Sequence, residues 1–320
     1  MCLAKKRVFK IVATVGLLLG LTQCATSLNT SEPAVSSQTS QAPAVQNIPQ
    51  PTLTIQNWPS DTAPVARVYV VTMSANDPIE VAVEDGLNTI ENFAVDTQAI
   101  AVLNGGFFDP NNAQTTSFIS VDGSLIADPR ENKRLVDNPD LAPYIEKILN
   151  RSEFRRYSCS GMNNSDDSSV DGIRYDITMR NSAVPRDCTL HSALGAGPQL
   201  LPQDTSFAEG FIDYANGVLS RDALGSLQRN ARSAVGIAGN TLVWVMVAQT
   251  SPAGGMTLAE LAEFMSTLQV QKALNLDGGS SSALTWSGLE SDDISQTYYG
   301  RLNDNGRPIQ RPVKSVLVIP

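Results

Sequence analysis

Four hydrophobic stretches of the chain border glycine-rich segments, and this feature constrains the fold more than any other. The segments are Asn104-Gly105-Gly106-Phe107-Phe108, Gly195-Ala196-Gly197-Pro198-Gln199-Leu200-Leu201, Arg232-Ser233-Ala234-Val235-Gly236 and Asn275-Leu276-Asp277-Gly278-Gly279-Ser280-Ser281-Ser282. Glycine lets a backbone approach a ligand closely and lets amide groups converge on an anion. One such loop indicates little, because glycine most often serves a turn. Four of them at strand ends in one chain predict a shared pocket.

Local patterns predict both strands and helices. Strands are expected at 65–71, 79–83, 99–103 and 315–319, and helices at 89–96, 141–150 and 257–268. Asp122-Gly123 and Gly239-Asn240 predict hairpins, because these pairs readily adopt the positive φ angles of tight turns. Strands and helices are mixed without regular βαβ alternation. We therefore expect an α/β (α+β) fold, a single domain around a mixed β-sheet with flanking helices.

Six ordered motifs resemble the phosphodiester glycosidase family, and the resemblance spans about residues 65–319. They are Asn-Gly-Gly-Phe-Phe at 104–108, Gly-Ala-Gly-Pro at 195–198, Arg-Ser-Ala-Val-Gly at 232–236, Gly-Met-Thr-Leu-Ala-Glu-Leu-Ala at 255–262, Asn-Leu-Asp-Gly-Gly at 275–279 and Arg-Pro-Val at 311–313. The family includes the vertebrate enzyme that removes N-acetylglucosamine from a phosphodiester and many bacterial exopolysaccharide-associated proteins. The chain departs from it at Ser280, where a third glycine is common, and at residues 248–250, where an acidic residue is common.

Asp277 and Arg232 are the main catalytic candidates. Asp277 follows a buried strand and precedes two glycines, where a carboxylate could act as acid, base or nucleophile at an anomeric carbon. Its alternative role is to cap the following loop. Arg232 could grip a phosphodiester through two parallel hydrogen bonds, and the alternative is an ordinary surface ion pair.

The remaining site candidates come from the same motifs. His191 is the single histidine and could share proton transfer with Asp277, although a lone histidine is often structural. Arg311 is a second candidate phosphate contact, but Arg301, Arg307 and Lys314 lie near it in sequence. The predicted substrate-binding residues are Asn104, Gly105, Gly106, Gly197, Gly278, Gly279 and Arg311. The competing role of the 104–106 segment is a tight turn that packs the two phenylalanines.

Other reaction classes are disfavoured. The chain has no Gly-x-Ser-x-Gly motif, so a hydrolase with a nucleophilic serine elbow is not expected. One histidine and no metal-type spacing predict neither a metal site nor a cofactor. Asp166, Asp167 and Asp171 could supply the carboxylates of a calcium-binding loop. Their spacing does not fit the EF-hand pattern, so a solvated loop is favoured.

The first 24 residues have the pattern of a bacterial export signal. Four basic residues precede Ile11–Gln23, which contains no charged residue and is too short for a stable membrane span. Cys24 ends Leu-Thr-Gln-Cys, which resembles a lipoprotein box, although Gln23 departs from the usual small residue. We expect lipidation at Cys24, with cleavage near Ser27 as the alternative. Membrane association would then come only from this anchor.

Charge excludes one class of partner. The chain carries a net charge of −9, and removing residues 1–23, with four positive charges, leaves −13. A body this acidic is poorly suited to nucleic acid or to an anionic membrane surface. An anionic substrate would have to meet a few specific cations.

The chain divides into a signal at 1–24, a disordered spacer rich in Ser, Thr, Gln and Pro at 25–64, and a domain at 65–320. Cys159 and Cys188 are the cysteines left in the exported body, and an oxidising compartment makes a disulfide between them the expected state.

The prediction is therefore an exported, periplasmic or surface hydrolase that cleaves a sugar-1-phosphate diester in envelope or exopolysaccharide glycans. Two alternatives remain open at this stage. One is a surface lipoprotein that binds glycans without catalysis, and the other is a hydrolase acting on ordinary glycosidic bonds.

Overall fold

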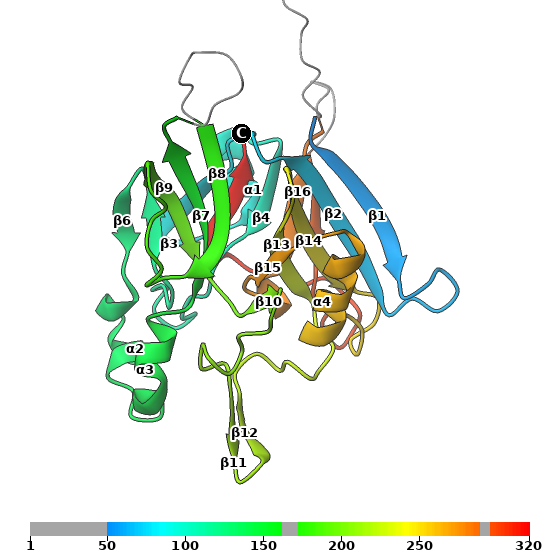
Figure 1. The fold of residues 1–320 in the computed structure, drawn as a ribbon. Helices are drawn as coiled ribbons and strands as arrows, with labels where there is room; N and C mark the ends of the chain where they lie inside the picture. The colour runs from blue at the N-terminus through cyan, green and yellow to red at the C-terminus, as the bar shows by residue number, and fades with distance from the viewer. Residues whose placement is uncertain (1–49, 162–171, 289–294) are drawn as a thin grey trace, which may run out of the picture. The chain divides into compact units, whose positions relative to one another are not determined.

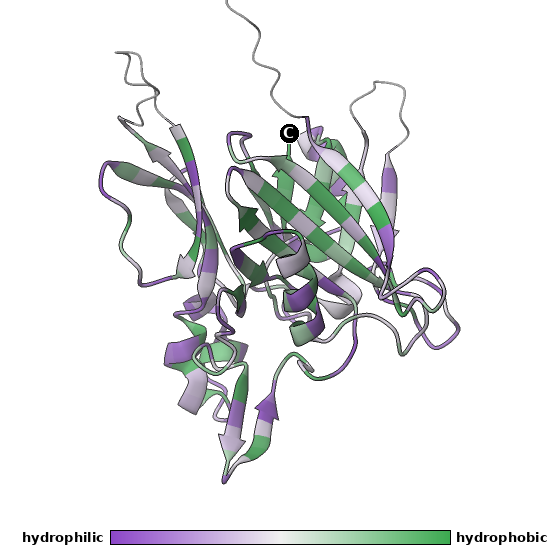
Figure 2. Ribbon diagram, turned by 45° about the vertical axis from the view of Figure 1, so that its right-hand side comes forward, coloured by the Kyte–Doolittle hydropathy of each residue, from purple (hydrophilic) through white to green (hydrophobic). Residues whose placement is uncertain are grey.

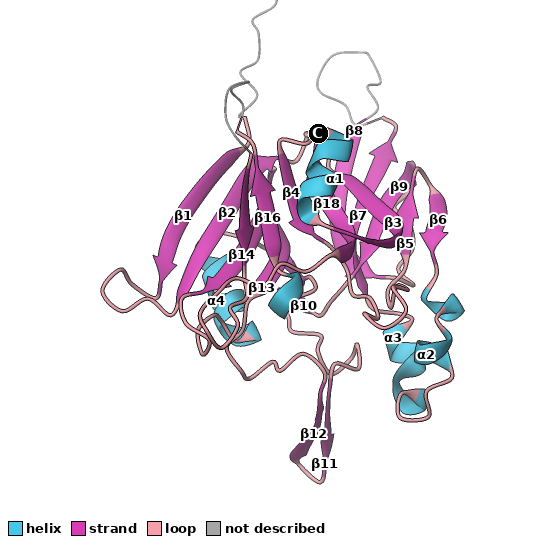
Figure 3. Ribbon diagram, turned by 180° about the vertical axis from the view of Figure 1, so that it is seen from behind, coloured by secondary structure: helices cyan, strands magenta, loops and turns pink. Residues whose placement is uncertain are grey.

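The computed structural model describes residues 50–161, 172–288 and 295–320, and its strands form three larger sheets and one hairpin. The first sheet runs in the order β1 (Thr52–Trp58), β2 (Ala66–Ser74), β14 (Thr241–Gln249), β13 (Arg232–Ala238), β15 (Lys272–Asn275) and β10 (Gln199–Leu201). The second is β17 (Gln296–Tyr299), β16 (Ala283–Trp286), β4 (Ala101–Asn104), β18 (Val313–Ile319) and β3 (Glu80–Asn88). The third is β6 (Ser124–Ala127), β5 (Ile119–Val121), β9 (Cys188–Gly195), β7 (Ser152–Cys159) and β8 (Gly172–Met179). Strands β11 (Ile212–Ala215) and β12 (Val218–Asp222) pair with each other and project from the rest in each of the three ribbon views (Figures 1–3).

The helices are few and short. They are α1 (Ile90–Thr97), α2 (Lys133–Val136), α3 (Ile145–Ile148) and α4 (Leu258–Thr267), with 3₁₀ turns at Pro129–Glu131, Ala142–Tyr144 and Gly279–Ser281. Every strand pairing in the described ranges is antiparallel. The domain is therefore mostly β, and the expectation of a mixed sheet flanked by helices is wrong. Tight hairpins such as those at Asp122-Gly123 and Gly239-Asn240 join antiparallel neighbours, whereas parallel pairing would need long crossovers.

Several local predictions are confirmed. Helix α4 carries the capping box between Thr257 and Glu260, and α1 begins after Thr89, whose side chain accepts from the Asn92 amide. Strand β14 is buried along almost its whole length, as its continuous apolar run predicts. The predicted helix at 141–150 is reduced to one 3₁₀ turn and the single-turn α3.

The ordered domain starts earlier than predicted. Residues 52–58 were assigned to the disordered spacer, but they form β1, which pairs with β2 over its full length. Strand β1 exposes Ile55 and other side chains, so its own pattern resembles a polar linker, and pairing with β2 supplies its stability. Predictions that concern residues 1–49 and 162–171, including Cys24 and Asp166, lie outside the described residues.

Three apolar clusters hold the sheets in place. The largest takes side chains from all three sheets, for example Trp244, Leu317 and Phe154. A second lies between the other face of the first sheet and α4, and includes Val245 and Leu261. Figure 2 shows hydrophobic residues concentrated on the strands behind α4. The third cluster joins α1 to the second sheet, and Figure 3 shows α1 lying across β18 and β4.

Within the described residues, no helix is long and apolar enough to cross a membrane. Cys159 and Cys188 form a disulfide with a Cα–Cα distance of 4.0 Å, as predicted. They face each other across β7 and β9.

Candidate active site

Asn104, the last residue of β4, fastens three separate segments together. Its Nδ2 donates to the Asp277 carbonyl at 2.7 Å, and its Oδ1 accepts from Ser233 Oγ at 2.6 Å and from the Ala283 amide at 3.1 Å. The residue is fully buried. Its side chain is therefore committed to holding the loops in register, and this geometry favours a positioning role over the predicted direct contact with substrate.

The two glycines after Asn104 are required by close packing. A Cβ on Gly105 would lie 2.7 Å from Ser315 Oγ, and one on Gly106 would lie 2.3 Å from the Gly195 carbonyl oxygen. The Gly105 amide donates to the Ser315 carbonyl at 2.8 Å, and the Gly106 amide donates to Ser315 Oγ at 3.2 Å. Both amides predicted to bind substrate oxygens are thus already used within the protein.

Gly197 brings the second predicted loop to the same place. Its φ is +115°, and its amide donates to the Asn275 carbonyl at 2.9 Å. Asn275 Nδ2 donates in return to the Gly197 carbonyl at 2.9 Å. The Gly-Ala-Gly-Pro loop therefore rests against the strand that carries Asp277.

Asp277 sits where these loops meet. Its amide donates to the Gly105 carbonyl at 3.0 Å, and its Oδ1 accepts from the Gly278 amide at 2.9 Å. Burial raises the pKa of Asp277 to about 6, opposed in part by the Ser281 hydroxyl, the charge of Arg311 and the Gly278 amide. A carboxyl group with this pKa changes protonation close to neutral pH, which suits acid–base chemistry.

Arg311 is the cation beside Asp277. Its Nη1 donates to Ser280 Oγ at 2.8 Å, and its guanidinium carbon lies 5.3 Å from the centre of the Phe108 ring. Ser280 is the residue that departs from the family pattern, so the departure here supplies a contact to the cation. Of the neighbouring basic residues, Lys314 donates to the Asp85 carbonyl at 2.7 Å and so points elsewhere. Arg301 is exposed, near Gly279.

Gly278 and Gly279 complete the turn after Asp277. The Gly279 amide donates to the Ala231 carbonyl at 2.8 Å, and a Cβ on Gly278 would lie 3.1 Å from that same oxygen. Like Gly105 and Gly106, they serve close packing, and their amides have partners inside the protein.

Arg232 does not point at Asp277. It is 3% exposed, and its guanidinium donates to the carbonyls of Met256, Leu224, Gly225 and Gln228 at 2.8 to 3.1 Å. These bonds fasten the 224–228 loop to the first sheet and occupy most of the donors that a phosphate would need. The geometry thus favours a structural role over the predicted phosphate contact, because the carbonyl cage depends on loop positions that the local sequence does not reveal.

His191 lies on β9 and faces the β5–β6 turn. Its Nε2 is 3.4 Å from Asp122 Oδ1, and its carbonyl accepts from the Gly123 amide at 2.7 Å. None of these contacts involves Asp277 or its neighbours. Of the three residues predicted to share catalysis, Asp277 lies at the junction of the loops, whereas His191 and Arg232 have partners elsewhere. Arg311, predicted as a phosphate contact, hydrogen-bonds to Ser280 close to Asp277.

Sequence reasoning missed the serines that follow Gly279. Ser280 contacts Arg311, and Ser281 contributes to the environment of Asp277. Their position directly after Asp-Gly-Gly is the signal in the sequence that places them at this turn.

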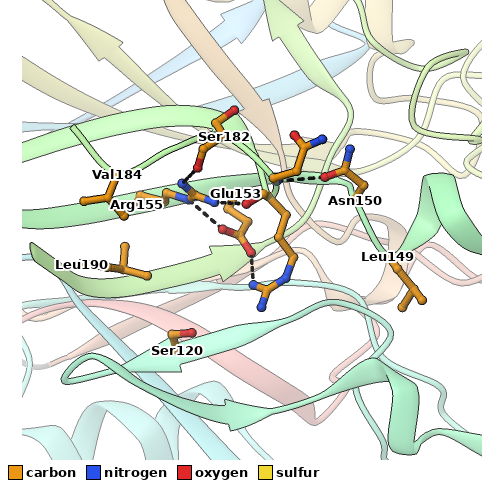
Figure 4. Close-up of a pocket in the computed structure, with 10 residues that line it drawn as sticks. Ser120, Leu149, Asn150, Glu153, Arg155, Ser182, Val184 and Leu190 are labelled. Atoms are coloured by element: carbon orange, nitrogen blue, oxygen red, sulfur yellow. Dashed lines mark hydrogen bonds and ion pairs between the residues drawn. The ribbon is translucent and has the colours of Figure 1, made fainter. Parts of the chain in front are cut away.

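A pocket of about 460 Å³ lies on the third sheet, away from Asp277. Figure 4 shows Arg155 directed at Glu153 within it, with Leu190 and Ser120 on the opposite wall. Glu153 accepts from Arg155 at 2.7 Å and from Arg180 at 2.6 Å, and Arg155 also donates to backbone carbonyls. These groups satisfy one another, so the pocket has the character of a structural ion-pair cluster. In the described ranges no group of three or more His, Cys, Asp or Glu is placed to hold a metal ion.

Comparison with known proteins identifies the fold family. The sequence profile of the family described as "Phosphodiester glycosidase" matches residues 97–319, which contain all the loops around Asp277. The chain belongs to this family. A search of curated protein sequences returns no match.

Three solved structures are similar to this phosphodiester glycosidase domain. One is the zebrafish N-acetylglucosamine-1-phosphodiester alpha-N-acetylglucosaminidase catalytic domain, auto-inhibited by its pro-peptide, with TM-score 0.56 and 17% identity over 85% of this chain and 84% of that one. A "putative exported protein" of Burkholderia pseudomallei has TM-score 0.53 and 14% identity over 82% and 75%. A hypothetical protein from Synechocystis has TM-score 0.51 and 17% identity over 84% and 61%. At sequence identities this low, the similarity to these three structures is evidence for a shared fold and for nothing further.

Proposed function

We propose that the protein is an exported hydrolase that cleaves a sugar-1-phosphate diester in envelope or exopolysaccharide glycans. The observation that carries the proposal is Asp277 itself, whose pKa burial raises to about 6 at the junction of the glycine loops, with the cation Arg311 held nearby through Ser280. Membership of the phosphodiester glycosidase family supports it. So does the zebrafish structure, whose protein acts on an N-acetylglucosamine phosphodiester.

Asp277 is proposed to act at the anomeric carbon. Its carboxylate either removes a proton from an attacking water or attacks the carbon itself, and the bond between the anomeric carbon and the phosphate oxygen breaks. The electron pair of that bond stays on the phosphate oxygen. The leaving group is then a phosphate monoester dianion, whose second pKa is about 6, so it departs without a strong acid. This is compatible with a site where no other carboxylate contacts Asp277 among the described residues.

Arg311 is proposed to bind the phosphate. A guanidinium can donate two hydrogen bonds to phosphate oxygens and offset the charge that builds on the leaving group. The Phe108 ring beneath it and Ser280 beside it fix its direction. In this proposal Arg311 takes the role that the sequence alone assigned first to Arg232.

The proposal is tested with purified protein and a panel of sugar-1-phosphodiesters. We expect release of free sugar from one or more of them, and loss of that release in a folded Asp277→Asn variant. The matching phosphate-free glycosides serve as controls. Turnover on those controls alone would indicate an ordinary glycosidase, and binding without turnover by any substrate would indicate a non-catalytic glycan-binding protein.

We further propose that the chain is exported and anchored through a lipid on Cys24. The support is the signal-like sequence of residues 1–24 together with the Cys159–Cys188 disulfide, which fits an extracytoplasmic location. Fractionation of cells expressing the full chain should place it in the membrane fraction and a Cys24→Ala variant outside it. Equal membrane association of both would contradict the anchor.

A further inference from the structure

Arg151, the residue before β7, is a buried cation without a bonded anion. It is 8% exposed, its Nε donates to the Glu209 carbonyl at 3.2 Å, and its guanidinium carbon lies 3.7 Å from the centre of the Phe211 ring. Within the described ranges, its two terminal nitrogens make no hydrogen bond and no carboxylate lies at ion-pair distance. Buried charges in proteins are normally paired, so this arrangement needs an explanation.

The nearest candidate partner, the Glu209 carboxylate, is already occupied. One oxygen accepts from the Ser152 amide at 3.0 Å, and the other accepts from Ser152 Oγ at 2.7 Å and from the Gln199 amide at 3.2 Å. Thr205 also donates its hydroxyl to this group. Glu209 therefore stabilises the loop that contains Gly197, and its hydrogen-bonding capacity is used there.

A second arginine, Arg221, makes the same kind of contacts, and its acceptor is the carbonyl of the residue after Glu209. Arg221, on β12, donates from Nε to the Gly210 carbonyl at 2.9 Å, and its guanidinium carbon lies 4.6 Å from the centre of the Tyr144 ring. The two arginines thus bind consecutive carbonyls, each beside an aromatic ring. Like Arg151, Arg221 uses only Nε among the described contacts, which leaves two guanidinium ends for an external acceptor.

Electrostatics favours an anion at this place. Burial lowers the pKa of Arg151 to about 9, and the positive charge of Arg221 adds to the effect, while the charge of Glu209 opposes it. The surrounding carboxylates have partners: Asp213 accepts from the Tyr144 hydroxyl at 2.8 Å, and Asp222 accepts from the Ser226 amide at 2.7 Å. An oxyanion between the two guanidinium groups would offset their mutual repulsion and accept their free N–H groups.

Two aromatic rings, Phe211 and Phe107, connect Arg151 to the candidate active site. The Phe211 ring centre is 5.6 Å from that of Phe107, which belongs to the Asn104 loop. A Cβ on Gly197 would lie 2.9 Å from the Phe211 ring, so Phe211 also touches the second loop. A long glycan bound at Asp277 could therefore place another of its groups at Arg151.

We propose that Arg151 and Arg221 form a second anion-binding site, which takes a phosphate or carboxylate group of the glycan away from the bond that is cleaved. The identification of the ligand as a glycan rests on the proposed function. The binding of an oxyanion does not, since it follows from the unpaired guanidinium groups.

The test measures binding of inorganic phosphate by calorimetry to the folded protein and to Arg151→Met and Arg221→Gln variants. We expect the dissociation constant to rise about tenfold or more in each variant, the loss of one charge-assisted pair of hydrogen bonds. Arg229→Gln is the matched control, because Arg229 also lies over an aromatic ring, Trp58, but is paired with Glu260 at 2.7 Å. Its phosphate binding should be unchanged.

The outcomes separate this site from the catalytic one. Unchanged phosphate affinity in Arg221→Gln and in a folded Arg151→Met would overturn the proposal; if Arg151→Met does not fold, Arg221→Gln decides alone. Arg311 is the other proposed phosphate contact, so the same titrations are repeated in an Arg311→Gln background; the effects of Arg151→Met and Arg221→Gln should persist there, whether or not the protein hydrolyses a phosphodiester. Displacement of phosphate by glucose 1-phosphate or by glucuronate would show which group the glycan supplies, and displacement by neither would overturn the assignment to a glycan.

Discussion

At the scale of single residues, the proposed reaction depends on how the protein sets the charge of Asp277. Burial disfavours the carboxylate, whereas Ser281, Arg311 and the Gly278 amide favour it, and the balance leaves the pKa raised to about 6. The group thus binds its proton more tightly in the folded protein than in the unfolded chain. Stability and activity should consequently depend on pH in opposite directions.

Because the pKa of Asp277 is raised in the folded protein, the protein should become less stable as pH rises. The contribution of the protonated Asp277 is fully present below its unfolded pKa of 3.8 and is lost as pH rises through about 6. The Asp277→Asn variant has no carboxyl group to titrate at this position. Between pH 4 and a pH above about 6, its free energy of unfolding should therefore rise by on the order of 2 kcal/mol relative to that of the unaltered protein. Urea unfolding of both proteins across this range measures it. A difference that does not change with pH would contradict the raised pKa.

The two arginines of the predicted site should behave differently when altered. Arg311→Gln should fold with nearly unchanged stability and raise KM or lower kcat for the phosphodiester, because Arg311 is the proposed phosphate contact and is held by Ser280 close to Asp277. Arg232→Gln should lower the free energy of unfolding by about 3 to 5 kcal/mol, since it removes a buried guanidinium that donates to four backbone carbonyls. Unfolding curves and steady-state kinetics of both variants distinguish the roles. Loss of stability in Arg311→Gln, with loss of activity alone in Arg232→Gln, would indicate that Arg232 and not Arg311 binds the phosphate.

At the scale of elements, the glycine loops act by letting backbones approach one another. Gly106 is the clearest case, because its Cα lies against the Gly195 carbonyl of a different loop. The amides of Gly105, Gly106, Gly278 and Gly279 donate to acceptors within the protein. In the proposed function, these glycines act by holding Asp277 and Arg311 in position.

Gly106→Ala should therefore be strongly destabilising. Its Cβ would lie 2.3 Å from a backbone oxygen that cannot move without shifting β9, so we expect a loss of about 2 to 4 kcal/mol. Gly86→Ala is the control, because nothing lies within 4 Å of the added Cβ at that strand position. Thermal unfolding of the two variants gives the comparison, and equal midpoints would refute the packing argument.

The elements that the sequence predicted correctly are those with local signals. The capping box at Thr257, the turn at Asp122-Gly123 and the apolar run of β14 each specify structure within a few neighbouring residues. Strand β1 and the antiparallel order of the sheets depend on partners distant in sequence, and no local pattern records them. The hydrogen-bond partners of Arg232 and Asn104 are likewise fixed only by the fold, and no local pattern predicts them.

At the scale of the whole molecule, the chain is acidic, whereas the substrate that we propose for it is an anion. The net charge of −9 for the chain gives no general attraction to phosphate. Affinity for the phosphate of the proposed substrate must then come from cations in defined positions. The described structure offers Arg311 near Asp277, and Arg151 and Arg221 near Phe211.

The disulfide contributes to the stability of the third sheet. It joins β7 to β9 and closes a loop with a sequence separation of 29 residues. Reduction, or replacement of both cysteines by serine, should lower the free energy of unfolding by about 3 kcal/mol, mainly by freeing the unfolded chain. Urea unfolding with and without reductant tests this. An unchanged midpoint would show that the bond adds no net stability.

The pH dependence of hydrolysis reports the protonation state of the group that acts, which we propose is Asp277. With a sugar-1-phosphodiester that the protein cleaves, kcat/KM should rise with pH to a plateau, with an apparent pKa of about 6 that is absent from the residual activity of Asp277→Asn. A profile of the same shape and size in a folded Asp277→Asn variant would contradict the assignment of the reaction to Asp277.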